Sequence, residues 1–231
     1  MSWVTKKINI SNRLKTIGDF VIDNSKVVDV GCDHALLSIY LYQNRNNINV
    51  ISTDINNGPL NEAKNNIKNY KLENKIETRL SDGLKNIEKN EFDTIIIAGM
   101  GGNTIVDILG FDIDKTISAN RIIIQANNNV DKVRKFLVNN NFKITDEKLV
   151  KENNIISIVI LFTKNTKNIK YSRDEILFGP ILLKENNILF KELLSNTLKK
   201  YSIILNKIPR KYIIKRYKMN KYISKIKSYI S

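Results

Sequence analysis

The chain is poor in the residues that bind metals or form cross-links. Its 231 residues include one cysteine, Cys32, and one histidine, His34. A single thiol cannot close an internal disulfide, and it does not supply the cysteine cluster of a zinc site. We therefore expect a protein without disulfides and without a metal ion. Cys32 is interpreted as a small residue beside a turn rather than as a reactive nucleophile.

Long apolar segments are also missing. No apolar run approaches the roughly 20 residues that span a bilayer, and the amino terminus, MSWVTKKINISNRL, lacks the apolar segment of a signal peptide. We expect no membrane segment and a cytoplasmic location. With 42% hydrophobic residues, the chain can bury one substantial core and has room for a smaller appendage. We expect a monomer with a larger domain over residues 1–165 and a smaller one over 166–231.

Acidic residues are absent after Glu192, although the whole chain has a net charge of +15. Eleven basic residues lie between Lys199 and Lys227, and without them the net charge is +15 − 11 = +4. AT-rich coding also favours lysine, but coding bias alone would spread the charge more evenly. The concentration indicates a nucleic-acid surface, with a merely solvated helix face as the alternative. The candidate RNA contacts are Lys199, Lys200, Lys207, Arg210 and Lys211, with Arg13 as a further candidate near the amino terminus.

Apolar runs bounded by turn residues alternate with helical patterns up to about residue 165. This pattern predicts an α/β fold with a mostly parallel seven-stranded sheet that ends in an antiparallel pair. The expected strands are one before Gly31, one that ends at Asp54, Ile76–Leu80, Asp93–Ala98, Arg121–Gln125, Phe142–Val150 and Ile155–Phe162. The expected helices include one after Gly31, Pro59–Tyr70, one from about Asn103, and Val130–Asn139.

From about Arg173 the apolar residues recur with helical spacing. One helix is expected from Leu182 to Ile208, before the interruption at Pro209, and a second from Tyr212 to Ile230. The two helices predict an antiparallel, coiled-coil-like hairpin. At 1.5 Å per residue the first helix would be about 40 Å long, enough to lie along an RNA helix. The apolar side of the second helix is expected to carry Tyr217, Ile223, Ile226 and Ile230.

The segment from Val27 to Asp54 is the first half of a nucleotide-binding sheet. A strand runs into a turn at Gly31, and the next strand ends at Asp54, where such folds bind a ribose diol. The additional glycines of a dinucleotide fingerprint are missing, and Asp29 and Asp33 would repel a pyrophosphate. This argues against a nicotinamide oxidoreductase. A cationic sulfonium nucleoside, S-adenosylmethionine, suits such an acidic turn better.

Four predicted strands end in residues that suit different parts of this one ligand, because ligands bind beyond the carboxyl ends of the strands in open α/β sheets. Gly31 would face the methionine portion, Asp54 the ribose hydroxyls, and Asp82 the adenine amino group. Asp29 would orient the loop or contact the methionine amine. The predicted cofactor-binding residues are Asp29, Gly31, Asp33, His34, Asp54, Ile55, Asp82, Gly83, Ala98, Gly99, Met100 and Gly101.

Several segments carry a resemblance to one enzyme family. They are SNRL near the start, DVGCDHALL, TDINNGPLNEAK, SDGL, IIIAGMGG, RIIIQANNNVDKVRKFL and LFGPILLKENNILFKELL. In this order they resemble the bacterial family of tRNA adenine-N1 methyltransferases that modify adenine-22, over nearly the whole chain. The resemblance implies a Rossmann-like class I methyltransferase fold, S-adenosylmethionine as methyl donor, tRNA as substrate, and a carboxy-terminal hairpin that aids tRNA binding.

Two residues of the first turn are candidates for catalysis. Positive charge develops on the adenine ring as N1 attacks a methyl group, so a carboxylate near the exocyclic amine would stabilise it. Asp33 is the candidate for this role, and His34 would orient the base or stack on it. The Asn/Asp-Pro-Pro-aromatic motif of many exocyclic-amine methyltransferases is absent after the fourth strand, which favours a ring nitrogen as acceptor.

Other functions remain open at this point. A methyltransferase that acts on another RNA position or on a small molecule would keep the same site, although a small substrate would leave the basic tail without a role. A non-catalytic RNA-binding protein with a methyltransferase fold is the third possibility, and the acids at the strand ends argue against it.

Overall fold

The computed structural model describes residues 6–230, so the first five residues of the amino terminus considered above lie outside the described part. The chain divides into two compact units, Met1–Pro180 and Ile181–Ser231, which we call unit 1 and unit 2. Each unit is described by itself. None of the described helices is long and apolar enough to cross a bilayer.

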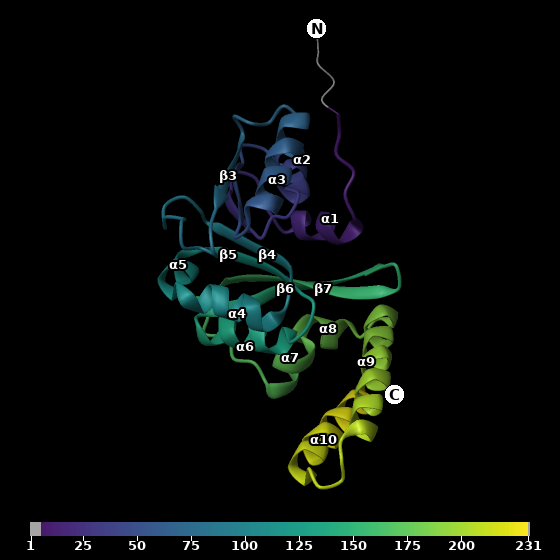
Figure 1. Ribbon diagram of the computed structural model, residues 1–231. Coiled ribbons are helices and arrows are strands. Elements are labelled where there is room, and N and C mark those ends of the chain that lie inside the picture. The colour runs from purple at the N-terminus through teal and green to yellow at the C-terminus, as the bar shows by residue number, and fades with distance from the viewer. Residues whose placement is uncertain (1–5, 231) are drawn as a thin grey trace. The chain divides into compact units, whose positions relative to one another are not determined.

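Unit 1 is built on one seven-stranded sheet with the order β3-β2-β1-β4-β5-β7-β6. The strands β1 to β5 pair in parallel, whereas β7 runs antiparallel to both β5 and β6. This confirms the predicted mostly parallel sheet with a terminal hairpin (Figure 1). The strands are β1 (Lys26–Val30), β2 (Asn49–Asp54), β3 (Ile76–Leu80), β4 (Thr94–Met100), β5 (Arg121–Ala126), β6 (Phe142–Glu152) and β7 (Ile155–Lys164).

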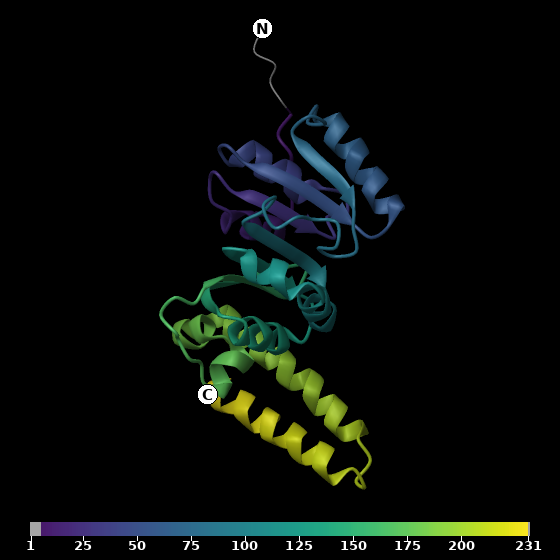
Figure 2. The same cartoon turned by 90° about the vertical axis from the view of Figure 1, so that its left-hand side faces the viewer.

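Helices lie on both faces of the sheet, as Figures 1 and 2 show for α1 to α3 on one face and α4 to α6 on the other. The helices of unit 1 are α1 (Asn12–Asp19), α2 (Leu36–Asn44), α3 (Asn57–Asn69), α4 (Gly102–Phe111), α5 (Ile113–Ser118), α6 (Val130–Asn139) and α7 (Arg173–Phe178). Helix α1 was not predicted from the sequence. Ser11 caps this helix by accepting a hydrogen bond from the amide of Leu14, but eight residues offer only a short apolar pattern.

The centre of the sheet is fully buried. Ile95, Ile96 and Ile97 of β4 have 0% exposure, as do Ile122 to Ile124 of β5. Each such side chain stabilises the fold by roughly 1.5–3 kcal/mol relative to an exposed one. The buried run is typical of a strand that is covered on both faces, and it gives the strand ends a rigid base.

Unit 1 extends through α7 rather than ending at residue 165, where the sequence led us to expect the boundary. The buried side chains of Arg134 and Glu147 form an ion pair, with 2.7 Å between Nη2 and Oε1. Nη1 of Arg134 also donates hydrogen bonds to the carbonyl oxygens of Ile176 and Leu177 in α7. This buried arginine ties the segment after β7 to α6 and β6, and no periodicity in the sequence indicates such a contact.

Unit 2 contains most of α8 (Pro180–Glu185), followed by α9 (Ile188–Lys207) and α10 (Ile213–Ile230). The helices α9 and α10 pack against each other as the predicted hairpin, where the rings of Tyr201 and Tyr222 lie 4.8 Å apart edge to face. The buried residues Ile223 and Ile226 of α10 lie on its packed side. Tyr217, which we expected on that side, is 66% exposed.

The predicted continuous helix from Leu182 to Ile208 is wrong, because it breaks between α8 and α9. Asn186 adopts φ 41°, in the left-handed region. The side chain of Asn187 then accepts a hydrogen bond from the amide of Phe190 and caps a new helix. The 20 residues of α9 extend about 30 Å at 1.5 Å per residue.

Candidate functional site

A cavity of about 520 Å³ opens at the carboxyl ends of β1 to β4 in unit 1. The strand order reverses between β1 and β4, so the cavity lies at the topological switch point where open α/β sheets bind ligands. Eleven of the twelve predicted cofactor residues line it. The exception is Gly101, which precedes α4 and faces Asn128. The lining residues that were not predicted to have a role in the site are Leu14, Val30, Cys32, Leu36, Leu37, Asn56, Ser81, Thr104 and Ile108.

The turn after β1 is held tightly against β2 and β4. The amides of Gly31 and Cys32 both donate to the carbonyl oxygen of Thr53 at 2.9 Å. Gly31 has φ 71°, and a side chain there would collide with the terminal methyl group of Met100. Asp33 also has a positive φ, 50°, which is uncommon for residues other than glycine and often marks functional turns. The positive φ and the nearby Met100 side chain together favour glycine at the first of these positions.

Asp29 is the buried acid of the cavity. It is 4% exposed and its Oδ2 accepts a hydrogen bond of 2.9 Å from the hydroxyl of Ser38, which accepts one from Ser52. Burial raises the pKa of Asp29 to about 6, against a smaller opposing effect of the Ser38 hydrogen bond. A cationic ligand group would favour the ionised form of this carboxyl group.

The pKa of Cys32 shows that the same cavity has a negative electrostatic potential. Burial raises the pKa of its thiol, and the negative charges of Asp29 and Asp54 raise it further. The thiol therefore stays protonated at neutral pH, which agrees with its interpretation as an unreactive residue. The two carboxylates make the cavity favourable for a cation, as expected for a sulfonium or an ammonium group.

The acids after β2 and β3 occupy different surroundings. Oδ1 of Asp54 accepts the amide of Asn56 at 2.9 Å and so shapes the β2–α3 turn. Ile55 beside it is 60% exposed, an apolar side chain open to the cavity. Asp82 pairs with Lys85 across 2.5 Å and is half exposed. The cavity thus offers a carboxylate, an exposed apolar surface and a partly neutralised carboxylate along one wall.

Asp33 and His34 lie at the rim, where Glu62 of α3 joins them. Nδ1 of His34 is 2.7 Å from Oε2 of Glu62, and Nε2 is 3.5 Å from Oδ1 of Asp33. With a carboxylate as its partner, Nδ1 carries a proton. The backbone carbonyl of His34 accepts from Asn66 of the same helix. Glu62 was not among the predicted site residues, because nothing in the spacing of the sequence shows that α3 presents it to this turn.

Gln125, at the carboxyl end of β5, organises the loop after β4. Its Oε1 accepts hydrogen bonds from the guanidinium of Arg13 at 2.8 Å and from the amide of Gly99 at 3.0 Å. Its Nε2 donates to Asn127, which donates in turn to the carbonyl oxygen of Gly99. Gly99 has φ 79°. The rule that ligands bind at strand ends, extended to β5, would have found Gln125 in the sequence.

Arg13 is a structural cation of this rim. Besides the bond to Gln125, its backbone amide donates to Glu152 of β6. Its side chain lines the cavity. Arg13 therefore supports the loop after β4 through Gln125, and it is also the residue that we predicted to contact a phosphate group. Within the described residues, no group of three or more His, Cys, Asp or Glu side chains has the arrangement of a metal site.

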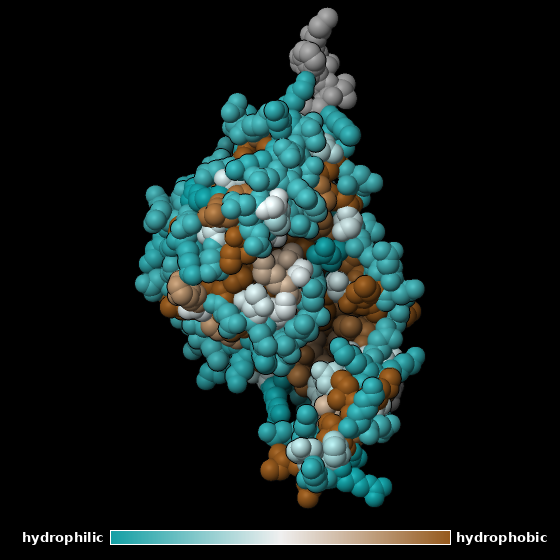
Figure 3. Space-filling view, in the orientation of Figure 1, coloured by the Kyte–Doolittle hydropathy of each residue, from teal (hydrophilic) through white to brown (hydrophobic). Residues whose placement is uncertain are grey.

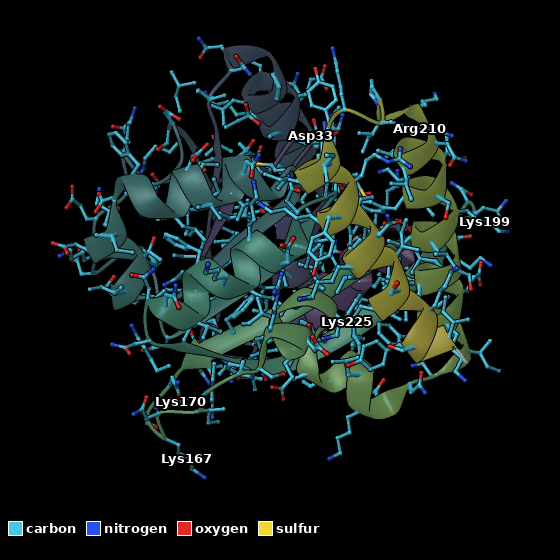
Figure 4. The ribbon with its side chains drawn as sticks, turned by 90° about the horizontal axis from the view of Figure 1, so that it is seen from below. Asp33, Lys167, Lys170, Lys199, Arg210 and Lys225 are labelled. Carbon is cyan, nitrogen blue, oxygen red and sulfur yellow. The ribbon has the colours of Figure 1, made fainter. Side chains whose placement is uncertain are left out.

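The other predicted RNA contacts belong to unit 2. Lys199, Lys200, Lys207, Arg210 and Lys211 are all exposed, and Figure 4 shows Lys199 pointing outward from α9. They lie along the second half of α9 and in the following loop. This region is an exposed cationic surface.

Comparisons with known proteins agree with this geometry. Residues 27–228 match the profile of a family described as tRNA (adenine(22)-N(1))-methyltransferase. A Bacillus subtilis protein of that same description is 31% identical over 188 residues, which cover 80% of this chain and 79% of the relative. The fold is similar to that of Streptococcus pneumoniae Sp1610 in complex with S-adenosyl-L-methionine (TM-score 0.87, 30% identity, 96% of this chain and 100% of that one). It is also similar to M. capricolum TrmK in complex with S-adenosyl-homocysteine (TM-score 0.83, 34% identity, 96% and 97%).

Proposed function

We propose the following mechanism for this chain, which belongs to the tRNA (adenine(22)-N(1))-methyltransferase family. It is an S-adenosylmethionine-dependent enzyme that methylates N1 of adenine-22 in tRNA. The monomeric state and the cytoplasmic location expected from the sequence are part of the proposal. The observation that carries the assignment of the site is that Asp29, Gly31, Asp54, Asp82 and Gly99 come from four strand ends and line one cavity.

The cavity residues suit the parts of S-adenosylmethionine. Asp54 binds the ribose hydroxyls, and the exposed side chain of Ile55 packs on the adenine ring. Asp82 accepts the adenine amino group, and Asp29 faces the methionine ammonium from the buried end. The glycines at 31, 83 and 99 let the backbone approach the ligand closely. The bound cofactor supplies an electrophilic methyl group on a sulfonium centre.

The target adenine binds at the Asp33 and His34 rim. Its N1 must point its lone pair at the methyl group, and holding the two reactants in line supplies much of the acceleration. Asp33 accepts a hydrogen bond from the exocyclic amine, where it stabilises the positive charge that develops on the ring and can take a proton. Glu62 fixes the His34 imidazole, which stacks on or orients the base.

The adenine must leave the folded RNA to reach this rim. Met100, whose methyl group contacts Gly31, offers a flexible apolar surface against which an extruded base can pack. The exposed cations of unit 2 bind phosphates of the tRNA and hold it without reading its sequence. Arg13 contacts a phosphate close to the target nucleotide.

Transfer of labelled methyl to an unmodified tRNA transcript tests this function. The matched control is the same transcript with guanine at position 22. We expect label only on the adenine transcript, at N1 of that nucleotide. Equal label on both transcripts would move the target elsewhere, and absence of label from a folded protein that binds S-adenosylmethionine would favour the small-molecule or the binding-only function.

A further inference from the structure

The loop end of the hairpin exposes apolar side chains that do not hold the hairpin together. Tyr212, Ile213, Ile214 and Tyr217 are 51%, 74%, 73% and 66% exposed, and Figure 3 shows apolar residues in brown at this end. We call residues 211–218 the tip. The apolar residues of α10 that bind it to α9 lie further along the helix. Exposed apolar clusters of this kind mark interaction sites.

The tip combines these apolar side chains with positive charge. Tyr212, Ile213 and Ile214 line a shallow hollow together with Lys211, Lys215 and Lys218. Nζ of Lys211 lies 5.6 Å from the centre of the Tyr212 ring. Since the chain has no acid after Glu192, this part of the hairpin has no negatively charged side chain of its own.

Arg216 gives the tip a fixed shape instead of adding to its outward charge. Its Nη1 donates hydrogen bonds to the carbonyl oxygens of Leu205 and Ile208, at 3.0 Å and 2.7 Å. These carbonyls belong to the end of α9, so one side chain of α10 closes the turn between the two helices. The hollow is therefore held by side-chain and backbone hydrogen bonds rather than by the exposed residues themselves.

The charge and shape of the tip distinguish between three possible partners: a second copy of the chain, a lipid surface and a nucleotide. A second copy of this chain would bring like charges together. A lipid surface requires an apolar face along a helix, but Ile223 and Ile226 of α10 are buried against α9. A nucleotide offers a flat base for a tyrosine ring and phosphates for lysines. Aromatic rings among cations bind unpaired bases in this way, whereas paired bases do not present their faces.

We propose that the tip is a binding site for an unpaired nucleotide of the RNA. The base packs on Tyr212, with Ile213 and Ile214 beneath it, and Lys211, Lys215 and Lys218 contact the neighbouring phosphates. The identity of the RNA as tRNA rests on the proposed function. The site differs from the phosphate contacts of α9 because part of its affinity comes from stacking, which depends little on salt.

The experiment measures the affinity of the full-length protein for an unmodified tRNA transcript over a range of salt concentrations. We expect Tyr212→Ala to weaken binding by about 5- to 100-fold with an unchanged salt slope, and Tyr212→Phe to stay near the wild type. The matched control is Ile188→Ala, because Ile188 is 87% exposed at the other end of α9 and its truncation should leave the affinity unchanged. In steady-state methylation, Tyr212→Ala should raise KM for tRNA and leave kcat unchanged.

Unchanged affinity of Tyr212→Ala, or an equal loss in Ile188→Ala, would overturn the proposal. So would a loss of self-association, or of binding to anionic phospholipid vesicles, without a change in RNA affinity. Methylation of the adenine-22 transcript by the wild type is scored separately. If it fails while Tyr212→Ala still weakens RNA binding, the tip stands and the proposed reaction falls; the reverse pattern removes only the tip.

Discussion

The cavity of unit 1 and the hairpin of unit 2 use charge in opposite ways. The acids of the cavity and its rim are few, and Asp29, Asp54 and the rim residue Glu62 each have a defined hydrogen-bond or ion-pair partner. The cations of the hairpin are many, and those named as RNA contacts are exposed on flexible side chains. Positioned charges act on single atoms, whereas numerous mobile charges raise the affinity for a polyanion wherever it lies. The first arrangement suits chemistry and the second suits docking.

The sharpest test of this contrast removes one positioned acid. We expect Asp33→Ala to lower the single-turnover rate of methylation by about 100-fold or more, within the range for a lost acid-base group. The assay uses saturating S-adenosylmethionine, because Asp33 also lines the cofactor cavity, and the affinity for tRNA should change little. A full rate in this variant would remove Asp33 from the chemistry. Asp33→Asn, which keeps the size of the side chain, separates loss of charge from loss of packing.

The buried acid should make cofactor binding depend on pH. The pKa of Asp29 is raised to about 6, while an α-ammonium group with a pKa near 8 stays charged below pH 7. Affinity for S-adenosylmethionine should therefore fall about tenfold from pH 7 to pH 5, as Asp29 takes up a proton. Calorimetry on Asp29→Asn should show weak binding without this slope. The same slope in the variant would assign it to another group that lines the cavity, Asp33, His34, Asp54 or Asp82.

The raised pKa of Asp29 also makes the stability of the fold depend on pH. This dependence is opposite in sign to that of cofactor affinity. Between about pH 4 and pH 6 the folded state binds a proton at Asp29 that the unfolded state has lost. The contribution of this group to the free energy of unfolding is therefore present at low pH and is lost as the pH rises through 6. Urea denaturation of the cofactor-free protein should show that Asp29→Asn gains stability over the wild type at pH 8 and not at pH 4.

Binding of tRNA through exposed lysines should depend on where those lysines lie in the structure and on the salt concentration. We expect Lys199→Gln with Lys200→Gln to weaken tRNA binding by about tenfold and to reduce the salt slope by about 1.5 to 2. The matched control replaces Lys167 and Lys170, which Figure 4 shows pointing into solvent from the loop after β7. Equal effects of the two pairs would mean that net charge alone matters, and that the hairpin has no special role.

The smallest expected effect concerns Glu62, which touches His34 rather than the substrate. Glu62→Ala removes one hydrogen bond to the imidazole and should lower kcat by about 2- to 10-fold without changing KM for tRNA. Glu62→Gln keeps an acceptor and should recover most of the rate. If both variants lose stability to the same extent as activity, the contact is structural only.

Much of the fold followed from the sequence because each element carried its own local signal. The apolar run of β4 and the turn at Gly31 needed no knowledge of the rest of the chain. The strand-end rule then placed Asp29, Asp54 and Asp82 at one edge. The limits of α6 were predicted without error.

The features that escaped prediction depend on contacts between distant segments. The Glu62 carboxylate reaches His34 only after α3 packs beside the β1 turn, and Arg134 ties down α7 across 42 residues of sequence. The break before α9 depended on the backbone of Asn186, since asparagine is tolerated inside helices and also adopts the left-handed conformation. Spacing alone does not decide between these two states.

The lack of acids after Glu192 has a consequence for the hairpin before any RNA arrives. Twelve cations on α9, α10 and the loop between them repel one another, so dissolved anions should strengthen the free hairpin. The same anions compete with RNA for those cations. Under the proposed docking role, added salt should therefore stabilise the hairpin and weaken its binding to RNA. If the hairpin docks tRNA as proposed, the phosphates of the tRNA would supply the negative charge that the sequence of the hairpin lacks.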